Sequence, residues 1–193
     1  IITSKGLAGI GKTFYVAMAP NTTSATYVNS TIGFIATEDN TSITLSGYNP
    51  NVVFSDGNTA NSLTFTLNKG QSYLADVVSM DAQENLDGLI GAKIVANKPI
   101  SVTNGNFNAI YTNQNFSNND ILMDQSVPIE RLGTDFVMVK GNGLITSEME
   151  QALVVATEDN TQIFVNGVNL GITLNAGNYT KIAGTNYIDH GNG

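Results

Sequence analysis

The hexapeptide Ala-Thr-Glu-Asp-Asn-Thr stands at residues 36–41 and again, unchanged, at residues 156–161. Apolar residues precede both copies and alternating apolar and polar residues follow them, so each copy is predicted to form a turn between two strands. Glu-Asp suits the central positions of a type I turn, and Asn tolerates the left-handed backbone that closes such a hairpin. We therefore expect Asn40 and Asn160 to occupy equivalent turn positions with positive φ.

The repeat extends beyond the hexapeptide. Residues 11–14 align with 133–136, and residues 66–70 align with 173–177. The offset falls from 120 at the hexapeptide to 107 at the last pair, so the first copy carries about 13 extra residues, around 49–62. A period near 120 is much longer than that of solenoid repeats and has the size of a β-sandwich module.

The composition also favours strands. Asn, Thr, Ser and Gly together make up 78 of 193 residues, and these residue types are poor helix formers. Runs rich in β-branched and aromatic residues, bounded by turn residues, predict strands at 13–19, 27–36, 42–46, 63–67, 72–78, 93–96, 99–103, 136–139, 152–156, 162–165 and 179–183. Helical turns are expected only within 80–89 and 121–132.

These patterns predict an all-β protein with two tandem related antiparallel β-sandwich units. The first unit is expected at 1–110, a connector at 111–132, and a second, incomplete unit at 133–193. The second unit is called incomplete because no equivalent of 91–106 follows it, so we expect the parent chain to continue. The alternative is one continuous larger β-structure in which both repeats share a sheet.

Charge and cysteine content exclude several function classes. The net charge is −8 with 8 basic residues, which argues against nucleic acid and against anionic lipid. The absence of Cys excludes thiolate metal sites, thiol nucleophiles and disulfides, and His190 is the single histidine. No apolar run is long enough to span a membrane. We therefore expect no catalytic residues, no cofactor and no direct membrane insertion.

One segment resembles a phosphate-binding loop. Residues 6–13 fit the pattern G-x-x-x-x-G-K-[ST], which requires a helix directly after the lysine. Here Phe14, Tyr15 and Val16 follow, which indicates a strand, and the second copy at 133–136 lacks the lysine. We expect this segment not to bind nucleotide.

The other site candidates are weak. Asp81, Glu84 and Asp87 gather oxygen ligands, so calcium is the one candidate ion, although their spacing is not that of an EF-hand loop. A solvated loop is the better interpretation. For ligand contact, the loops at 49–62 and 110–120 are the freest to vary. The candidate contact residues there are aromatic: Tyr48, Phe54, Tyr111 and Phe116. The alternative is that these aromatic side chains pin the loops onto the sandwich.

Several segments together resemble a known family. Residues 11–21, 35–44, 66–73, 91–106 and 124–128 are similar, in that order, to the N-terminal domain of IgGFc-binding-protein-like proteins. The resemblance implies a secreted, extracellular cell-surface location. Its many bacterial members, especially in Flavobacterium relatives, are long surface proteins associated with type IX secretion and gliding motility. No residue-level binding site is carried over from the family.

Three functions fit these observations. The first is a non-enzymatic module of a large secreted cell-surface protein, with a role in adhesion or as a surface filament or scaffold. The second is a carbohydrate-binding or glycan-cleaving module, against which the absence of Trp counts. The third is a purely structural repeat of an extracellular matrix or filament. The expected partners are a surface glycan or protein ligand, further copies of the chain through self-association, or neighbouring domains of the same chain.

Overall fold

The computed structural model describes residues 4–21, 29–79, 82–109, 111–112 and 120–191. Its described part is all-β, as the sequence predicts. A seven-stranded antiparallel sheet contains β1 (Ile10–Tyr15), β2 (Ser30–Ala36), β3 (Thr41–Ser46), β4 (Ser62–Leu67), β5 (Ser72–Asp76), β6 (Lys93–Ala109) and β7 (Asp120–Gln125). Two small sheets pair β8 (Ala152–Val155) with β11 (Tyr179–Ile182), and β9 (Thr161–Val165) with β10 (Val168–Leu174).

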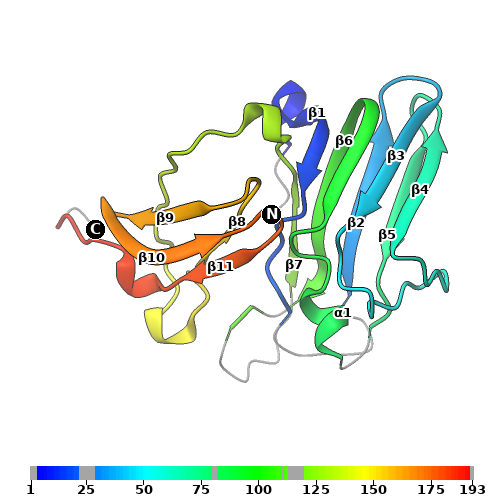
Figure 1. Cartoon of the computed structure of the whole chain (residues 1–193). Coiled ribbons are helices and arrows are strands. Elements are labelled where there is room, and N and C mark those ends of the chain that lie inside the picture. Colours follow the sequence, from blue (N-terminus) through cyan, green and yellow to red (C-terminus); the bar gives the residue numbers. More distant parts are fainter. Residues whose placement is uncertain (1–3, 22–28, 80–81, 110, 113–119, 192–193) are drawn as a thin grey trace.

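Helical structure is limited to single turns in these residues. The α-helix α1 (Gln83–Asp87) lies within the stretch 80–89, where a helical turn is predicted. The 3-10 turns are η1 (Gly6–Gly9), η2 (Ile129–Arg131), η3 (Ile145–Ser147) and η4 (Gly184–Asn186). In Figure 1 the large sheet forms one side of the molecule and β8–β11 form the other.

Strand β6 organises the large sheet. Along one edge it pairs first with β3 and then with β2, and along the other edge with β1 and then with β7. Pro99 lies between the segment paired to β3, which ends at Ala96, and the segment paired to β2, which begins at Ile100. Because proline lacks an N–H group, this gap in the ladder is where it is tolerated. The two strands predicted at 93–96 and 99–103 are therefore one.

The main core lies on one face of this sheet. Alternate side chains of β2, β3 and β6 point into it, and Ile32, Phe34, Ile43, Ile94 and Ile100 are each 0% exposed. The ring of Phe34 also contacts Phe65 edge-on, with centroids 5.2 Å apart. Burial of one such side chain contributes roughly 1.5–3 kcal/mol to the stability of the fold, so the packing of β6 against its neighbours stabilises the large sheet.

The two hexapeptides form equivalent turns, which confirms the prediction. Asn40 has φ 51° and Asn160 has φ 59°. The hydroxyl of Thr41 donates to the carbonyl oxygen of Glu38 at 2.7 Å, and Thr161 donates to that of Glu158 at 2.8 Å.

Each hexapeptide turn is locked to a second turn. The carboxylate of Asp39 accepts a hydrogen bond from the N–H of Lys69 at 3.0 Å, and the carboxylate of Asp159 accepts one from the N–H of Ala176 at 3.0 Å. The second turns belong to the repeated segments 66–70 and 173–177. Strands β2–β5 and β8–β11 are thus joined by the same pair of interlocked turns.

Two further segments differ from the sequence predictions. Residues 136–139, predicted as a strand, are extended coil with Phe136 68% and Val137 92% exposed. The stretch 121–132, predicted to hold helical turns, contains the helical turn η2, but its residues 121–125 belong to β7, which pairs with β6. The repeats do not share a sheet, because β8–β11 form sheets of their own. These small sheets do not make a complete sandwich.

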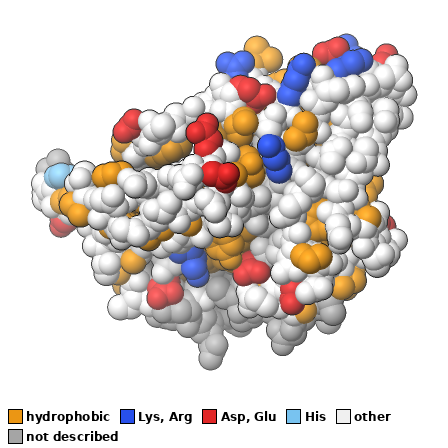
Figure 2. Space-filling view, viewed as in Figure 1, with side chains coloured by type: hydrophobic (Ala, Val, Ile, Leu, Met, Phe, Trp, Pro, Cys, Tyr) orange, Lys and Arg blue, Asp and Glu red, His pale blue; other side chains and the backbone are white. Residues whose placement is uncertain are grey.

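The small sheets pack directly on the large one. Leu153, Val155 and Tyr179 pack against the main core. At Gly91 (φ 82°), an added Cβ would lie 1.7 Å from the carbonyl oxygen of Gly177, so only glycine fits at this contact. Figure 2 shows the face of the molecule that results, on which charged side chains are few and scattered among neutral ones.

Candidate ligand-binding depression

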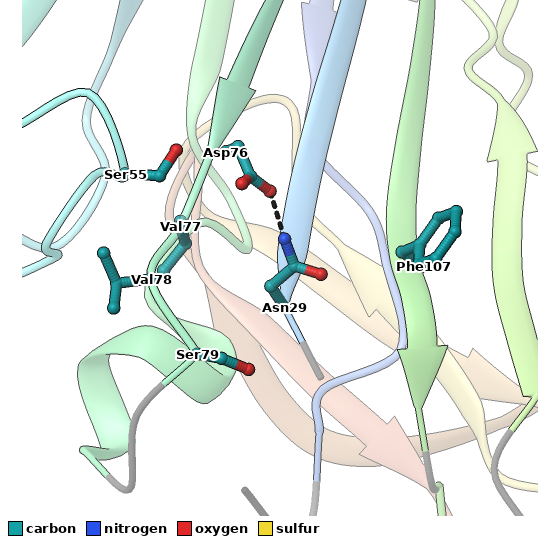
Figure 3. A pocket seen from close by; sticks show the side chains of 7 residues that line it. All are labelled: Asn29, Ser55, Asp76, Val77, Val78, Ser79 and Phe107. Atoms are coloured by element: carbon teal, nitrogen blue, oxygen red, sulfur yellow. Dashed lines mark hydrogen bonds between the residues drawn. The ribbon is translucent and has the colours of Figure 1, made fainter. Parts of the chain in front are cut away.

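A shallow depression of about 500 Å³ lies beside the ends of β5 and β6 (Figure 3). It is lined by side chains from four parts of the chain: Asn29, Ser55, Asp76, Val77, Val78, Ser79 and Phe107. Asn29 immediately precedes β2, Asp76 is the last residue of β5, and Phe107 lies near the end of β6. The antiparallel pairing of β2 with β5 and β6 brings these three positions together.

An amide and a carboxylate form the polar part of this depression. The side-chain amide of Asn29 donates a hydrogen bond to the carboxylate of Asp76 (Figure 3). The backbone also fixes this corner, because the N–H of Phe107 donates to the carbonyl oxygen of Asn29 at 3.3 Å. The remaining lone pairs of the carboxylate and the amide oxygen are acceptors for hydroxyl or N–H groups of a ligand.

An aromatic side chain forms the apolar part. The ring of Phe107 is 62% exposed on the outer face of β6, although Asn106, directly before it, and Ala109, two residues after it, are buried. An exposed ring and a hydrogen-bonding pair that line one depression are a combination through which proteins contact sugars and peptide side chains. Asp76 is the one carboxylate among the lining residues, whereas glycoside cleavage uses two. The arrangement offers hydrogen-bonding groups and an aromatic side chain for binding a ligand.

The loop 49–62 borders the depression through Ser55, but the two contact residues predicted at its start and within it face inward. Tyr48 is 6% exposed and Phe54 is 3% exposed, and their rings pack edge-on with centroids 5.2 Å apart. The hydroxyl of Tyr48 also donates to the carbonyl oxygen of Ala60 at 2.5 Å. Both rings thus pin the loop onto the core and offer a ligand almost no surface. The loop reaches the depression through Ser55 instead, whose N–H donates to the carbonyl oxygen of Asp76 at 2.8 Å.

The other two predicted contact residues lie elsewhere. Phe116 lies outside the described residues. Tyr111 is half-buried, and its hydroxyl oxygen is buried without a hydrogen-bond partner. Burial, and next the charge of Glu148, raise the pKa of Tyr111 above its ordinary value. The neighbouring Thr112 donates from its hydroxyl to the carbonyl oxygen of Ser147 at 2.7 Å, which ties this segment to η3.

The candidate calcium ligands are only partly described. Asp81 lies outside the described residues, while Glu84 and Asp87 are on α1. The carboxylate of Asp87 accepts hydrogen bonds from Gln83 at 2.7 Å and from the hydroxyl of Tyr179 at 3.2 Å. Asp87 therefore joins α1 to the sheet formed by β8 and β11. Within the described part of the chain, no three acidic or histidine side chains cluster closely enough to hold a metal.

The segment that resembles a phosphate loop has a structural role. Gly11, Lys12 and Thr13 belong to β1, so no helix follows the lysine; of the strand predicted at 13–19, residues 13–15 form and the strand ends at Tyr15. A Cβ at Gly11 would lie 2.3 Å from the Pro128 side chain. Close packing against the segment after β7 therefore explains this glycine.

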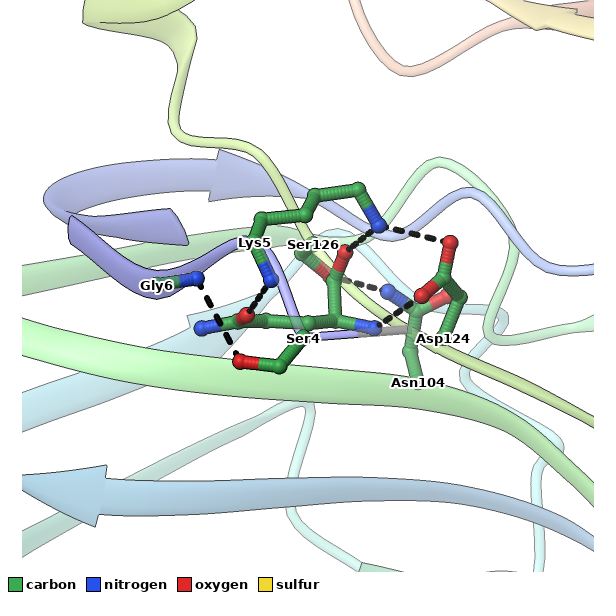
Figure 4. A network of polar contacts seen from close by, with 7 residues as sticks. Ser4, Lys5, Gly6, Asn104, Asp124 and Ser126 are labelled. Carbon is green, nitrogen blue, oxygen red and sulfur yellow. Dashed lines mark hydrogen bonds and ion pairs between the residues drawn. The ribbon is translucent and has the colours of Figure 1, made fainter. Parts of the chain in front are cut away.

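A polar network fixes the N-terminal segment to the end of β7 (Figure 4). The ammonium group of Lys5 lies 2.6 Å from the carboxylate of Asp124 and donates to the carbonyl oxygen of Gln125 at 2.5 Å. Asn104, on β6, donates from its side chain to Ser126. The Lys5 contacts join residues about 120 apart in sequence, and the Asn104 contact joins β6 to the residue after β7, so the network has a structural explanation and does not define a site.

Sequence reasoning missed the lining residues Asn29, Asp76 and Phe107. A weak signal was present for Phe107, because alternation along β6 puts the polar Asn104 and Asn106 inward and leaves this phenylalanine on the outer face. No local signal links Asn29 with Asp76, which lie 47 residues apart.

Comparison with known proteins places the chain in a family. Residues 5–189 match the family described as IgGFc binding protein, and the chain belongs to that family. This is a family of extracellular binding modules that is not known for enzymatic activity. No curated protein and no solved structure matches the chain. In the part that the structure describes, no helix is long and apolar enough to cross a membrane.

Proposed function

We propose that the chain is a non-enzymatic binding module of a large secreted cell-surface protein, and that it contacts a surface glycan or protein ligand at the depression beside β5 and β6. Family membership supports the extracellular binding role. The observation that carries the site is that the hydrogen-bonded pair of Asn29 and Asp76 and the exposed ring of Phe107 line one depression. The adhesion role, and the link to bacterial type IX secretion and gliding, belong to this proposal.

A carbohydrate ligand is the second, narrower candidate. Phe107 offers a flat apolar face, while Asp76 and Asn29 offer acceptors and donors within the same depression. Neighbouring hydroxyl groups of a sugar can form hydrogen bonds with both the carboxylate and the amide. The C–H face of the sugar ring then packs on the aromatic side chain. A peptide ligand would use the same ring and carboxylate, but it would also need backbone hydrogen bonds.

The test is binding of the purified chain to glycan and protein arrays. Phe107→Ala and Asp76→Asn are each expected to weaken binding by about tenfold or more, as central contacts do. Phe164→Ala is the matched control, because this phenylalanine is 58% exposed but lies on β9, away from the lining residues. Equal loss in the control, or unchanged binding in both site variants, would place the ligand elsewhere.

The non-enzymatic part needs its own measurement. Incubation with polysaccharides should give no turnover. Turnover abolished by a single Asp or Glu substitution would contradict the proposal, and Asp76→Asn is the first variant to examine.

A further inference from the structure

The second unit repeats four consecutive strands of the first. Residues 152–156 correspond to 32–36, and residues 161–165 correspond to 41–45, both at an offset of 120. The same backbone hydrogen bonds recur: the N–H of Gly70 donates to Ala36 at 2.9 Å, and that of Gly177 donates to Ala156 at 2.9 Å. Thus β8, β9, β10 and β11 correspond to β2, β3, β4 and β5, with the same pairs formed within each set.

In the first unit, β6 completes this arrangement. It pairs with β2 and β3 along the edge that β5 and β4 leave free, from Ala36↔Ile100 to Ser30↔Asn106 and from Ser46↔Lys93 to Ile43↔Ala96. Its inward side chains, which include Ile94 and Val102, are 0% exposed. Its other edge takes up β1, which places Phe14 at 0% exposure.

The second unit lacks this strand in the part of the chain that is described. There β8 pairs only with β11, and β9 pairs only with β10, so one edge of β8 and one of β9 remain without a strand partner. Unpaired edges of this kind are templates for another strand.

The burial of equivalent side chains shows the consequence. Phe34 and Leu45 are 0% exposed, whereas their equivalents Val154 and Val165 are only partly buried. The difference in exposure is largest for the segment equivalent to β1. Phe14 is 0% exposed, but its equivalent Phe136 is 68% exposed and lies in extended coil. Without a β6-like strand, the segment 136–139 has no ladder to join, which explains why the strand predicted there does not form.

We propose that the free edges of β8 and β9 accept a β6-type strand, supplied by the same polypeptide on the C-terminal side of β11. The occupant is an extended segment with aliphatic residues at alternate positions, antiparallel to β8 and β9. Its outer edge then pairs with residues 136–139 as β6 pairs with β1. The order of the repeat supports this source, because β6 follows β5 in the first unit, and β5 corresponds to β11.

This inference is independent of the ligand depression, which lies on the first unit. A second copy of the chain is the less favourable source, because its own β6 is the central strand of the large sheet and pairs with four other strands. Its removal would open that sheet.

The test extends the 193-residue chain after Gly193 with a copy of residues 87–109. The copy of Lys93 then stands 18 residues after Ile182, as Lys93 itself stands 18 residues after Ala75, to which Ile182 corresponds. Backbone amide exchange is measured for residues 136–139, 152–156 and 161–165, together with the oligomeric state. We expect exchange at these amides to slow by about tenfold or more while the protein stays monomeric. The reason is that an amide in a newly formed strand pair exchanges only when that pair opens, which costs free energy.

Two controls make the outcome decisive. An extension of the same composition in scrambled order should give no protection, and neither should the copy with proline in place of Val95, which breaks the ladder. The proposal is overturned if the native extension protects none of the three segments. It is also overturned if protection appears only in a concentration-dependent dimer, or if the chain without extension already shows it.

Discussion

The backbone N–H of Asn160 donates to the side-chain oxygen of Asn175 at 3.3 Å, and 120 residues earlier the N–H of Asn40 donates to Asn68 at 3.1 Å. Each bond joins a residue in the left-handed region to the second of two interlocked turns. The repeat therefore preserves the turn geometry and the hydrogen bonds as well as the residue sequence. It also fixes how two pairs of strands follow one another.

The first prediction concerns these turns. Asn40→Val and Asn160→Val are each expected to lower the free energy of unfolding by about 1 kcal/mol or more, because β-branched residues are strained at positive φ. Urea denaturation provides the measurement. Asn40→Gly is the matched control, since glycine adopts this backbone without strain and keeps the N–H group that bonds to Asn68. A valine variant as stable as the glycine variant would contradict this explanation.

The second prediction concerns the contact between the small and large sheets. Gly91→Ala is expected to lower the free energy of unfolding by about 2 kcal/mol or more, because strain at φ 82° adds to a clash with the carbonyl oxygen of Gly177. Gly57→Ala is the control: its φ is 77°, but no atom lies within 4 Å of the added Cβ. The difference between the two variants, measured by denaturation, reports the clash alone. Equal losses would show that the sheets separate freely here.

The third prediction is a pH dependence. Burial, and next the charge and hydrogen bond of Asp87, raise the pKa of Tyr179 to about 12. Because the folded state holds this proton more tightly than the unfolded chain, the stabilisation is fully present below pH of about 10 and is lost as the pH rises toward 12. Ultraviolet titration of the phenolate should follow this in the intact protein.

Two variants separate the causes at Tyr179. Asp87→Asn removes the charge and should lower the tyrosine pKa, so its phenolate appears at lower pH than in the parent chain. Tyr179→Phe should flatten the loss of stability over the same range. An unchanged titration in Asp87→Asn would mean that burial accounts for the whole shift.

The fourth prediction concerns residues 6–13. ATP should not bind saturably, and Lys12→Ala should change neither binding nor stability by more than about 0.5 kcal/mol, since the lysine lies on an exposed position of β1. Isothermal titration calorimetry with ATP and magnesium measures this directly. Saturable binding that disappears in Lys12→Ala would contradict the assignment of this segment as a plain strand.

The sequence by itself determined the strand-rich class, the two turns and the repeat, because these depend on local chemistry. Asn40 and Asn160 are readable from neighbouring residues, since turn preference is a property of a few adjacent side chains. The strand after Thr13 was predictable for the same reason, from its aromatic and β-branched residues. Family membership also followed from the order of short segments.

Only the tertiary structure decided which segments meet. The sequence predicted Tyr48 and Phe54 to be exposed loop residues, but both side chains are buried in the core. Phe107 is exposed because the register of β6 places it on the outer face of the sheet. Asn29 and Asp76 meet in the depression because β2 and β5, which are distant in sequence, pair with each other. Residues 136–139 have the composition of a strand, yet a strand forms only where a partner supplies its hydrogen bonds. Long-range pairing depends on the whole fold, so no local pattern reveals it.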